Sequence, residues 1–305
     1  MSKHASAHSA DRAFKVIILT AFLDILGLGL LIPVLPPIVR DFAARAASGL
    51  DPSGAVLFGF LDRVVSDPAA LANGLAFSLF SLGMLIGGIS FGSLSDRIGR
   101  KKTLMFTAAL GVAGYLFFGL SSSILAFLAG RFLSGLAGGG FPVTQAYIGD
   151  LYDPKERAVK MGMVGAAFGA GFTIGPALGG FISGFGLHTV GLISAAVMLV
   201  DLALIYFVLP EPKHHEWHAK RPEHETSSPF PWGELLPVYA VASAVALGFS
   251  GMQSTFGFVL PDRFHVSQQA VGYALGIVGL TSIAFQGYLI RYVRAVFLEK
   301  GMLLF

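Results

Sequence analysis

The sequence contains no cysteine, and this absence excludes disulfide bonds, thiolate metal sites and a cysteine nucleophile. Charged residues are also scarce, at 13% of the 305 positions, whereas a soluble protein carries about a quarter. The hydrophobic residues, 54% of the total, gather in blocks of about 18 to 25 residues, the length that a helix needs to cross a bilayer. These features predict an all-α integral membrane protein.

The apolar blocks predict about eight complete transmembrane helices and the start of a ninth. A polar link with a short amphipathic stretch around residues 56–65 is expected at residues 39–72. We expect the last block to be cut short, so that the chain is a C-terminally truncated one. The expected helices cover residues 15–38, 73–94, 103–120, 124–149, 158–183, 189–209, 233–260 and 270–290, and the ninth starts at residues 301–305.

Basic residues set the expected orientation. Sixteen of the 21 lysines and arginines fall on one side of this threading and four on the other, while Arg131 lies inside a helix. Because basic links stay in the cytoplasm, the N-terminus and residues 92–102 are predicted to be cytoplasmic, in a multi-pass protein of the cell (inner) membrane. Topology explains the positive charge, so the formal net charge of +3 does not indicate a nucleic-acid partner.

A polar segment divides the chain. Residues 210–232 hold Pro, His, Glu, Lys and Ser with few aliphatic residues, which predicts a solvated cytoplasmic linker. It separates an N-terminal six-helix bundle, residues 1–209, from an incomplete C-terminal bundle, residues 233–305. Residues 287–305 follow the order of residues 92–106, a glycine, then basic residues, then Leu, Met and Phe, which suggests a duplicated half.

Three charged side chains lie deep inside predicted helices, away from the helix ends. Asp24 is roughly 13 Å along its helix, where a carboxylate must be paired, hydrated or protonated. It is interpreted as functional, or alternatively as a structural aspartate near a helix bend, and Asp201 has the same two interpretations. Arg131 either pairs with an intramembrane acid or reaches an interface as an anchor.

Small residues are dense between residues 165 and 180, and Pro176 lies among them. Glycines four apart let helix backbones approach closely, and proline bends a helix, so a tight and kinked helix contact is expected. A histidine cluster in the linker could suggest a metal site. Because no helix is expected there, it is interpreted as solvated, and no metal is expected at His214, His215 and His218.

Taken together, these segments resemble the major facilitator superfamily, in particular its twelve-helix drug:proton antiporter branch close to the tetracycline/proton antiporters. The resemblance covers the chain from its first predicted helix to its end. Its motifs are GSLSDRIGRKK at residues 92–102, GFTIGPALGG at 171–180, LDILGLGLLIPVLP at 23–36, RFLSG at 131–135, and AYIGD at 146–150 followed by Glu156 and Arg157.

The resemblance implies a secondary active transporter that exports a hydrophobic, drug-like compound in exchange for protons by alternating access. It implies no enzymatic activity, no cofactor beyond the proton gradient, and a monomer in the lipid bilayer. Asp24 would carry the proton or meet a cationic substrate, with Arg131 and Asp201 as further proton-coupling candidates. Asp96 and Arg100 would form a charge network with Asp150 that latches the cytoplasmic side. The predicted gating loop comprises Gly92, Asp96, Arg97, Gly99, Arg100, Lys101 and Asp150. The antiporter motif comprises Gly171, Gly175, Pro176, Gly179 and Gly180. The residues expected to line the substrate cavity are Gln145, Tyr147, Phe168 and Gln253.

The sequence departs from the family pattern in three ways. It has Gly114 or a close neighbour where the tetracycline branch has an acid, its first link is longer, and helices 9 to 12 are not present. Such a chain is expected to be inactive unless a partner supplies the rest. Two other functional hypotheses therefore stay open. The chain could be a non-transporting membrane interaction protein, or a major facilitator transporter of another small solute.

Overall fold

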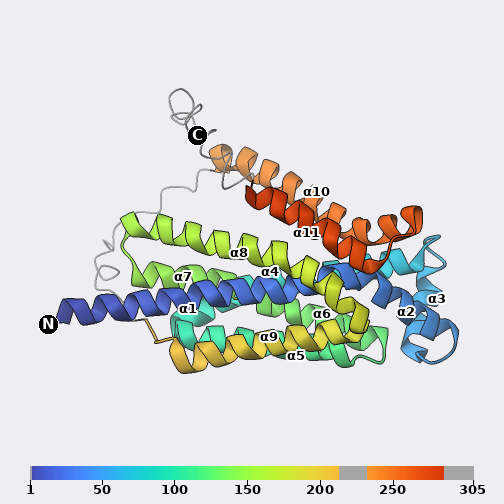
Figure 1. Ribbon diagram of the computed structural model, residues 1–305, viewed down its shortest axis with the longest axis horizontal. Coiled ribbons are helices and arrows are strands. Elements are labelled where there is room, and N and C mark those ends of the chain that lie inside the picture. The colour runs from blue at the N-terminus through green and yellow to red at the C-terminus, as the bar shows by residue number, and fades with distance from the viewer. Residues whose placement is uncertain (1, 213–231, 285–305) are drawn as a thin grey trace.

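The computed structural model describes residues 2–212 and 232–284, and in this part of the chain every regular element is helical. The longer helices run along one common direction and form an elongated bundle (Figure 1). The elements are α1 (Ser2–Leu31), η1 (Ile32–Val34), α2 (Leu35–Ala47), α3 (Pro52–Leu61), α4 (Pro68–Ile98), α5 (Arg100–Leu120), α6 (Ile124–Gly138), α7 (Phe141–Leu151), α8 (Pro154–Ile182), η2 (Ser183–Phe185), α9 (Leu187–Val208), α10 (Trp232–Phe264) and α11 (Gln268–Ala284).

Seven segments of the described chain are long and apolar enough to cross a membrane, and α11 adds a shorter apolar stretch. The prediction of an all-α membrane bundle with about eight helices is therefore confirmed. The predicted ninth helix at residues 301–305 and most of the predicted linker lie outside the described residues. The seven segments are Ala10–Ala47, Pro68–Ile98, Arg100–Leu120, Ile124–Leu151, Val159–Phe185, Leu187–Val208 and Leu235–Phe264.

The first link differs from the sequence prediction because helical structure extends into it. The chain stays helical to Ala47 instead of leaving the helix at residue 38, since its prolines fall in the first turns of η1 and α2, where a missing N–H costs no helical hydrogen bond. The link then forms α3, whose N-cap Asp51 accepts a hydrogen bond from Gly54 N at 3.0 Å. Asp67 caps α4 in the same way through Ala70 N, also at 3.0 Å.

The predicted gating loop at residues 92–102 is almost entirely helical. Helix α4 continues to Ile98 and α5 begins at Arg100, so that Gly99 alone connects them. Gly99 has a φ of 104°, a conformation that residues with a Cβ rarely adopt, and this turns the chain within one residue. The loop prediction was wrong because Gly92, Ser95 and Asp96 suit turns but are tolerated within a helix.

The fourth spanning segment is broken in the middle, whereas the sequence predicted one helix over residues 124–149. Helix α6 ends at Gly138 and α7 begins at Phe141, with Pro142 in its first turn. The run of three glycines from residue 138 has a low helix propensity, and proline suits the start of a new helix. The two parts together still form one span, Ile124–Leu151.

Helix α1 packs between α8 and α9, and α5 packs between α6 and α9 (Figure 1). The contact of α1 with α8 is formed by the predicted glycine motif. A Cβ on Gly175 would lie 2.7 Å from Gly29 Cα, and one on Gly179 would collide with the carbonyl oxygen of Leu30. Glycine at these positions therefore lets the two backbones touch.

Helices α10 and α11 pack on the bundle near the end that carries α3, called here the α3 end (Figure 1). Pro176 and Gly180 of α8 face α11, and a Cβ on Gly272 would lie 2.5 Å from Gly180 Cα. Among the described residues no atom beyond the adjacent backbone of the same helix lies within 4 Å of a Cβ placed on Gly165 of α8 or Gly248 of α10. The named contacts of α10 and α11 thus lie toward the α3 end.

Candidate functional site

Two carboxylates from neighbouring helices lie at the same level of the bundle. Helices α1 and α9 run antiparallel, and Ser194 Oγ donates a hydrogen bond to Gly27 O at 3.2 Å. The Sδ atom of Met198 lies 3.7 Å from the position of a Cβ on Gly27. Asp24 lies about one helical turn before Gly27, and Asp201 lies about one turn after Met198. The two carboxylates interact electrostatically. Two of the predicted proton-coupling residues are thus brought together.

Burial differs between the two carboxylates. Asp201 is fully enclosed, with 0% of its surface exposed, whereas Asp24 is only partly buried. Thr20, one turn before Asp24 on α1, is 1% exposed and faces Asp201. Neither oxygen of Asp201 nor the hydroxyl of Thr20 has a hydrogen-bond partner of acceptable geometry in the described part of the chain. Sequence reasoning did not single out Thr20, because a threonine in an apolar run is unremarkable.

The third proton-coupling candidate, Arg131 on α6, is 1% exposed. Its guanidinium lies over the ring of Phe80, 4.6 Å from the centroid, and 6.0 Å from that of Phe77. It forms no ion pair within the described residues, and its Nε and one terminal nitrogen have no hydrogen-bond partner there. Arg131 therefore follows neither sequence interpretation, since it neither pairs with an acid nor reaches an interface. Aromatic faces supply its attraction instead.

At the opposite end of the bundle, called here the basic end, the predicted network residues meet. Arg100 Nε lies 2.9 Å from Asp150 Oδ2, and a terminal nitrogen of Arg100 lies 2.6 Å from Asp96 Oδ1. Arg100 also donates to the hydroxyl of Ser95. The structure joins these residues across the ends of α4, α5 and α7, and their role as a latch stays a prediction.

Other gating-loop candidates lie around this network without joining it. Lys101 Nζ donates to Tyr206 O at 2.9 Å, and Lys101 N donates to a carboxylate oxygen of Glu211 at 3.2 Å. Gly92 lies within α4, and Arg97 is exposed in its last turn. Glu211 was missed by the sequence analysis, which assigned it to the linker, although an acid next to a basic turn is a usable signal.

The residues predicted to line the cavity are scattered. Tyr147 is fully buried and its hydroxyl donates to Pro210 O at 2.6 Å, so it ties α7 to the segment after α9 and lines no cavity. That prediction was wrong, because helical position alone does not give the direction of a side chain. Gln145 is exposed and Phe168 partly buried. The side chain of Gln253 lies outside the described residues.

A further ion pair links the bundle to α10 at the α3 end. Arg40 of α2 lies 2.6 Å from Asp262 Oδ2, and its guanidinium is 4.7 Å from the ring centroid of Phe258. Sequence reasoning missed this pair, because its members are 222 positions apart and each looks like an ordinary charge near a helix end.

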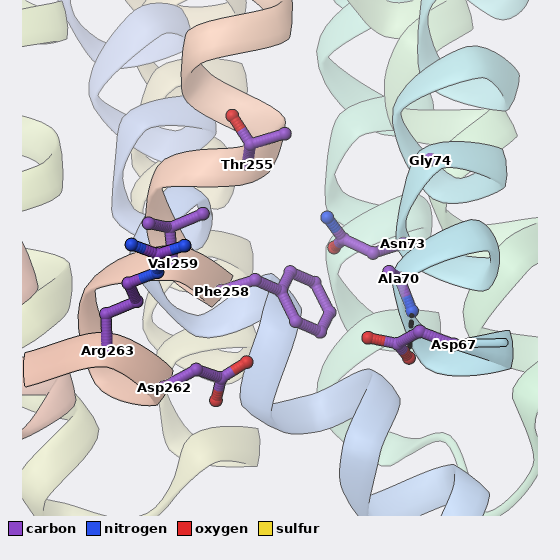
Figure 2. A pocket seen from close by; sticks show the side chains of 9 residues that line it. All are labelled: Asp67, Ala70, Asn73, Gly74, Thr255, Phe258, Val259, Asp262 and Arg263. Carbon is purple, nitrogen blue, oxygen red and sulfur yellow. Dashed lines mark hydrogen bonds between the residues drawn. The ribbon is translucent and has the colours of Figure 1, made fainter. Parts of the chain in front are cut away.

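Next to this ion pair lies a cavity of about 400 Å³ between α4 and α10. Figure 2 shows the side chains of α10 on one side and those of α4 on the other, with Phe258 pointing across between them. Its polar lining is Asp67, Asn73, Thr255, Asp262 and Arg263. Asp67 already accepts the cap hydrogen bond from Ala70, which Figure 2 draws as a dashed line.

Outside the spans, Asp51 joins the α2–α3 link to the start of α6. Its carboxylate accepts hydrogen bonds from Ile124 N at 2.9 Å, Gly54 N at 3.0 Å and Ser53 Oγ at 2.7 Å. Burial alone would raise the pKa of Asp51, but these hydrogen bonds outweigh it and lower the pKa from its usual value. The anion is thereby fixed at a helix N-terminus.

Ionisable side chains inside membrane-spanning helices are costly to keep, and the proteins that keep them are typically transporters of ions and solutes. The bundle belongs to that class. A family model described as Major Facilitator Superfamily matches residues 17–304, and the chain belongs to this family.

Curated proteins and a solved structure resemble the chain over most of its length. The chain is 30% identical to the bovine major facilitator superfamily domain-containing protein 10, over 93% of this chain and 68% of the relative. It is 28% identical to the class C tetracycline resistance protein of Escherichia coli, over 95% and 69%. A solved structure, the human organic anion transporter MFSD10 (TETRAN), matches with a TM-score of 0.71 at 25% identity, over 92% of this chain and 72% of that one. The chain thus spans about two thirds of the length of the curated relatives named here.

Proposed function

We propose that the protein is a secondary active transporter that exports a hydrophobic, drug-like compound in exchange for protons. The observation that supports this most is Asp24, a partly buried carboxylate within a membrane span, beside a second carboxylate. Such a group takes up and releases a proton as its surroundings change. The similarity to a tetracycline resistance protein supports the export of a drug-like substrate.

The packing of α10 and α11 supports alternating access. Their named contacts lie toward the α3 end, whereas a Cβ placed on Gly165 of α8 or Gly248 of α10 would meet no other helix among the described residues. With the N-terminus in the cytoplasm, as the basic residues predict, the α3 end faces outward and is the closed one. On this proposal the bundle is open toward the cytoplasm, which is an inward-facing state of an inner-membrane protein, and a cytoplasmic substrate enters from that side.

A second substrate class has its own support. The human relative of solved structure is titled an organic anion transporter, and Arg131 places a buried cation without an ion pair among the described residues. An organic anion would be attracted by that guanidinium. This candidate differs from the first in the charge of the substrate and uses the same bundle.

Everted membrane vesicles that carry the protein test the proposal. Addition of a tetracycline or another drug-like compound is expected to release protons, and Asp24→Asn is expected to abolish this exchange. Asp62→Asn is the matched control, since Asp62 is an exposed aspartate on the link after α3. Equal exchange with and without Asp24→Asn would contradict the role of Asp24, and proton movement driven only by organic anions would favour the second substrate class.

A further inference from the structure

We propose that Thr20, Asp24 and Asp201 form one proton-binding site, in which the two carboxyl groups share a single proton. The inference rests on the proposed function, because it specifies where the coupling proton is held. It adds Asp201 and Thr20 as parts of the site and fixes its capacity at one proton.

The first observation behind this site is the register of α1 against α9. The hydrogen bond from Ser194 to Gly27 and the approach of Met198 to Gly27 fix the level at which these helices meet. As the residue number rises on α1 it falls on α9, as it must for antiparallel neighbours. Asp24 and Asp201 are therefore brought to the same level by helix packing, where they interact electrostatically.

The second observation is the burial of Asp201. Asp201 is fully enclosed, and both of its oxygens lack a hydrogen-bond partner within the described chain. An ionised carboxylate in such a place is strongly disfavoured unless a cation or hydrogen-bond donors meet it. The nearby hydroxyl of Thr20, also buried and without a partner, is one donor available to it.

A proton completes this arrangement. Two facing carboxylates repel each other, and one proton removes that repulsion by neutralising one group. The protonated carboxyl gains an O–H donor that the remaining carboxylate can accept, while the hydroxyl of Thr20 donates to a second oxygen. The buried acceptors that now lack partners would then be satisfied.

Repulsion within the pair favours one proton over two. Tyr115 of α5 interacts electrostatically with Asp24 and with Arg131 of α6, but no ion pair joins Arg131 to either carboxylate among the described residues. Two ionised carboxylates at one site repel each other, so the first proton is bound tightly. Once one group is neutral that repulsion is gone, and a second proton is bound much less readily.

The unequal burial of the carboxylates assigns them different tasks. Asp24 is partly exposed and is the group through which the proton enters and leaves. Asp201 has no exposed surface and acts through Asp24, by holding the proton in the pair. Asp201 is therefore a positioning residue.

Infrared titration of the purified protein in liposomes, labelled with ¹³C-aspartate, tests the site without requiring transport. The wild-type protein is expected to lose the signal of protonated aspartate in two steps separated by more than about one pH unit, as interacting carboxyls do. With Asp201→Asn the remaining carboxyl, Asp24, is expected to titrate in one step at a different midpoint. An Asp24 step with the same midpoint in both proteins would overturn the proposal.

Three controls sharpen the result. Asp62→Asn, on an exposed link, is expected to leave both steps unchanged. Asp201→Glu keeps a carboxyl at this position, so two steps are expected even where Asp201→Asn fails to fold. The titration is repeated with sodium in place of potassium, and a midpoint that depends on sodium would overturn the proton assignment in favour of a metal cation. If drug-driven proton release fails while the coupled titration persists, the proposed function falls and the shared site stands.

Discussion

The two ends of the molecule are both held by an arginine–aspartate pair, but the pairs differ in burial and in what they connect. At the basic end, the side chains of Arg100 and Asp150 are 12% and 4% exposed, and both belong to the bundle of α1 to α9. At the α3 end, those of Arg40 and Asp262 are 38% and 51% exposed, and they join α2 to α10. The first pair is enclosed, whereas the second is open to its surroundings.

This difference indicates different tasks. Removing one member of a buried pair leaves an uncompensated charge, and the loss of stability is large. An exposed pair contributes little, so it can break and form again at small cost. The basic-end pair is therefore suited to fixing the bundle, and the α3-end pair to a contact that opens and closes during alternating access.

The largest effect is expected at the basic end. Arg100→Ala should lower the free energy of unfolding by about 3 kcal/mol, because the buried carboxylate of Asp150 loses its arginine. Unfolding by sodium dodecyl sulfate in mixed micelles would measure this. The side chain of Asp96, the second partner of Arg100, is 64% exposed. Asp96→Asn should therefore change stability by well under 1 kcal/mol.

A double-mutant cycle separates charge from packing in this prediction. Arg100→Ala combined with Asp150→Asn should be less destabilising than the sum of the two single substitutions. The reason is that Asp150→Asn removes the buried negative charge that Arg100→Ala deprives of its arginine. Additive single effects would mean that Arg100 acts through its aliphatic stem, and the contrast between the two ends would then not be one of charge burial.

A smaller effect is expected at Asp51, the buried carboxylate of the α3 end that is held by hydrogen bonds. Asp51→Asn should destabilise the protein at pH 7 by about 1 kcal/mol, because both carboxylate oxygens accept hydrogen bonds and the amide NH2 cannot accept one. The pKa of Asp51 is lowered in the folded state, so its contribution is complete above the ordinary carboxyl value and is lost as the pH falls below about 4. The stability difference between wild type and Asp51→Asn should therefore shrink on acidification.

Thermal unfolding in detergent between pH 3 and pH 7 would measure that difference. Asp62→Asn, an exposed aspartate on the next link, should show no pH-dependent difference from wild type. A difference for Asp51→Asn that stays constant with pH would show that Asp51 acts through its shape and not its charge. The charge of Asp51 would then contribute nothing to the stability of the α3 end.

How much of this the sequence could predict depends on the range of each interaction. The spans were predictable because an apolar run of sufficient length is a local signal, and Asp24 and Asp201 were visible as single charges within such runs. That the two face each other depends on the register of α1 against α9, which no local pattern contains. Helix ends were predicted less well, since the turn at Gly99 depends on one positive φ angle.

The smallest effect on stability, and the sharpest test of the comparison, is expected at the exposed pair. Arg40→Ala should lower the free energy of unfolding by at most about 1 kcal/mol. It should nevertheless raise, by up to about fivefold, the fraction of molecules in which α10 has separated from the bundle. The substitution removes both the ion pair with Asp262 and the contact with the Phe258 ring. Spin labels at Ser66→Cys and Ser267→Cys, two exposed positions on either side of the contact, would measure the separation.

The chain has no native cysteine, so these two labels are the only ones introduced. Arg63→Ala, which removes an exposed arginine near the same end, should leave the distance distribution unchanged. If Arg63→Ala broadens the distribution as much as Arg40→Ala does, a general loss of charge is responsible and the specific pair is not. If neither does, the α3 end is closed by the glycine contacts of α8 with α11 alone, and its ion pair is no more than a surface contact.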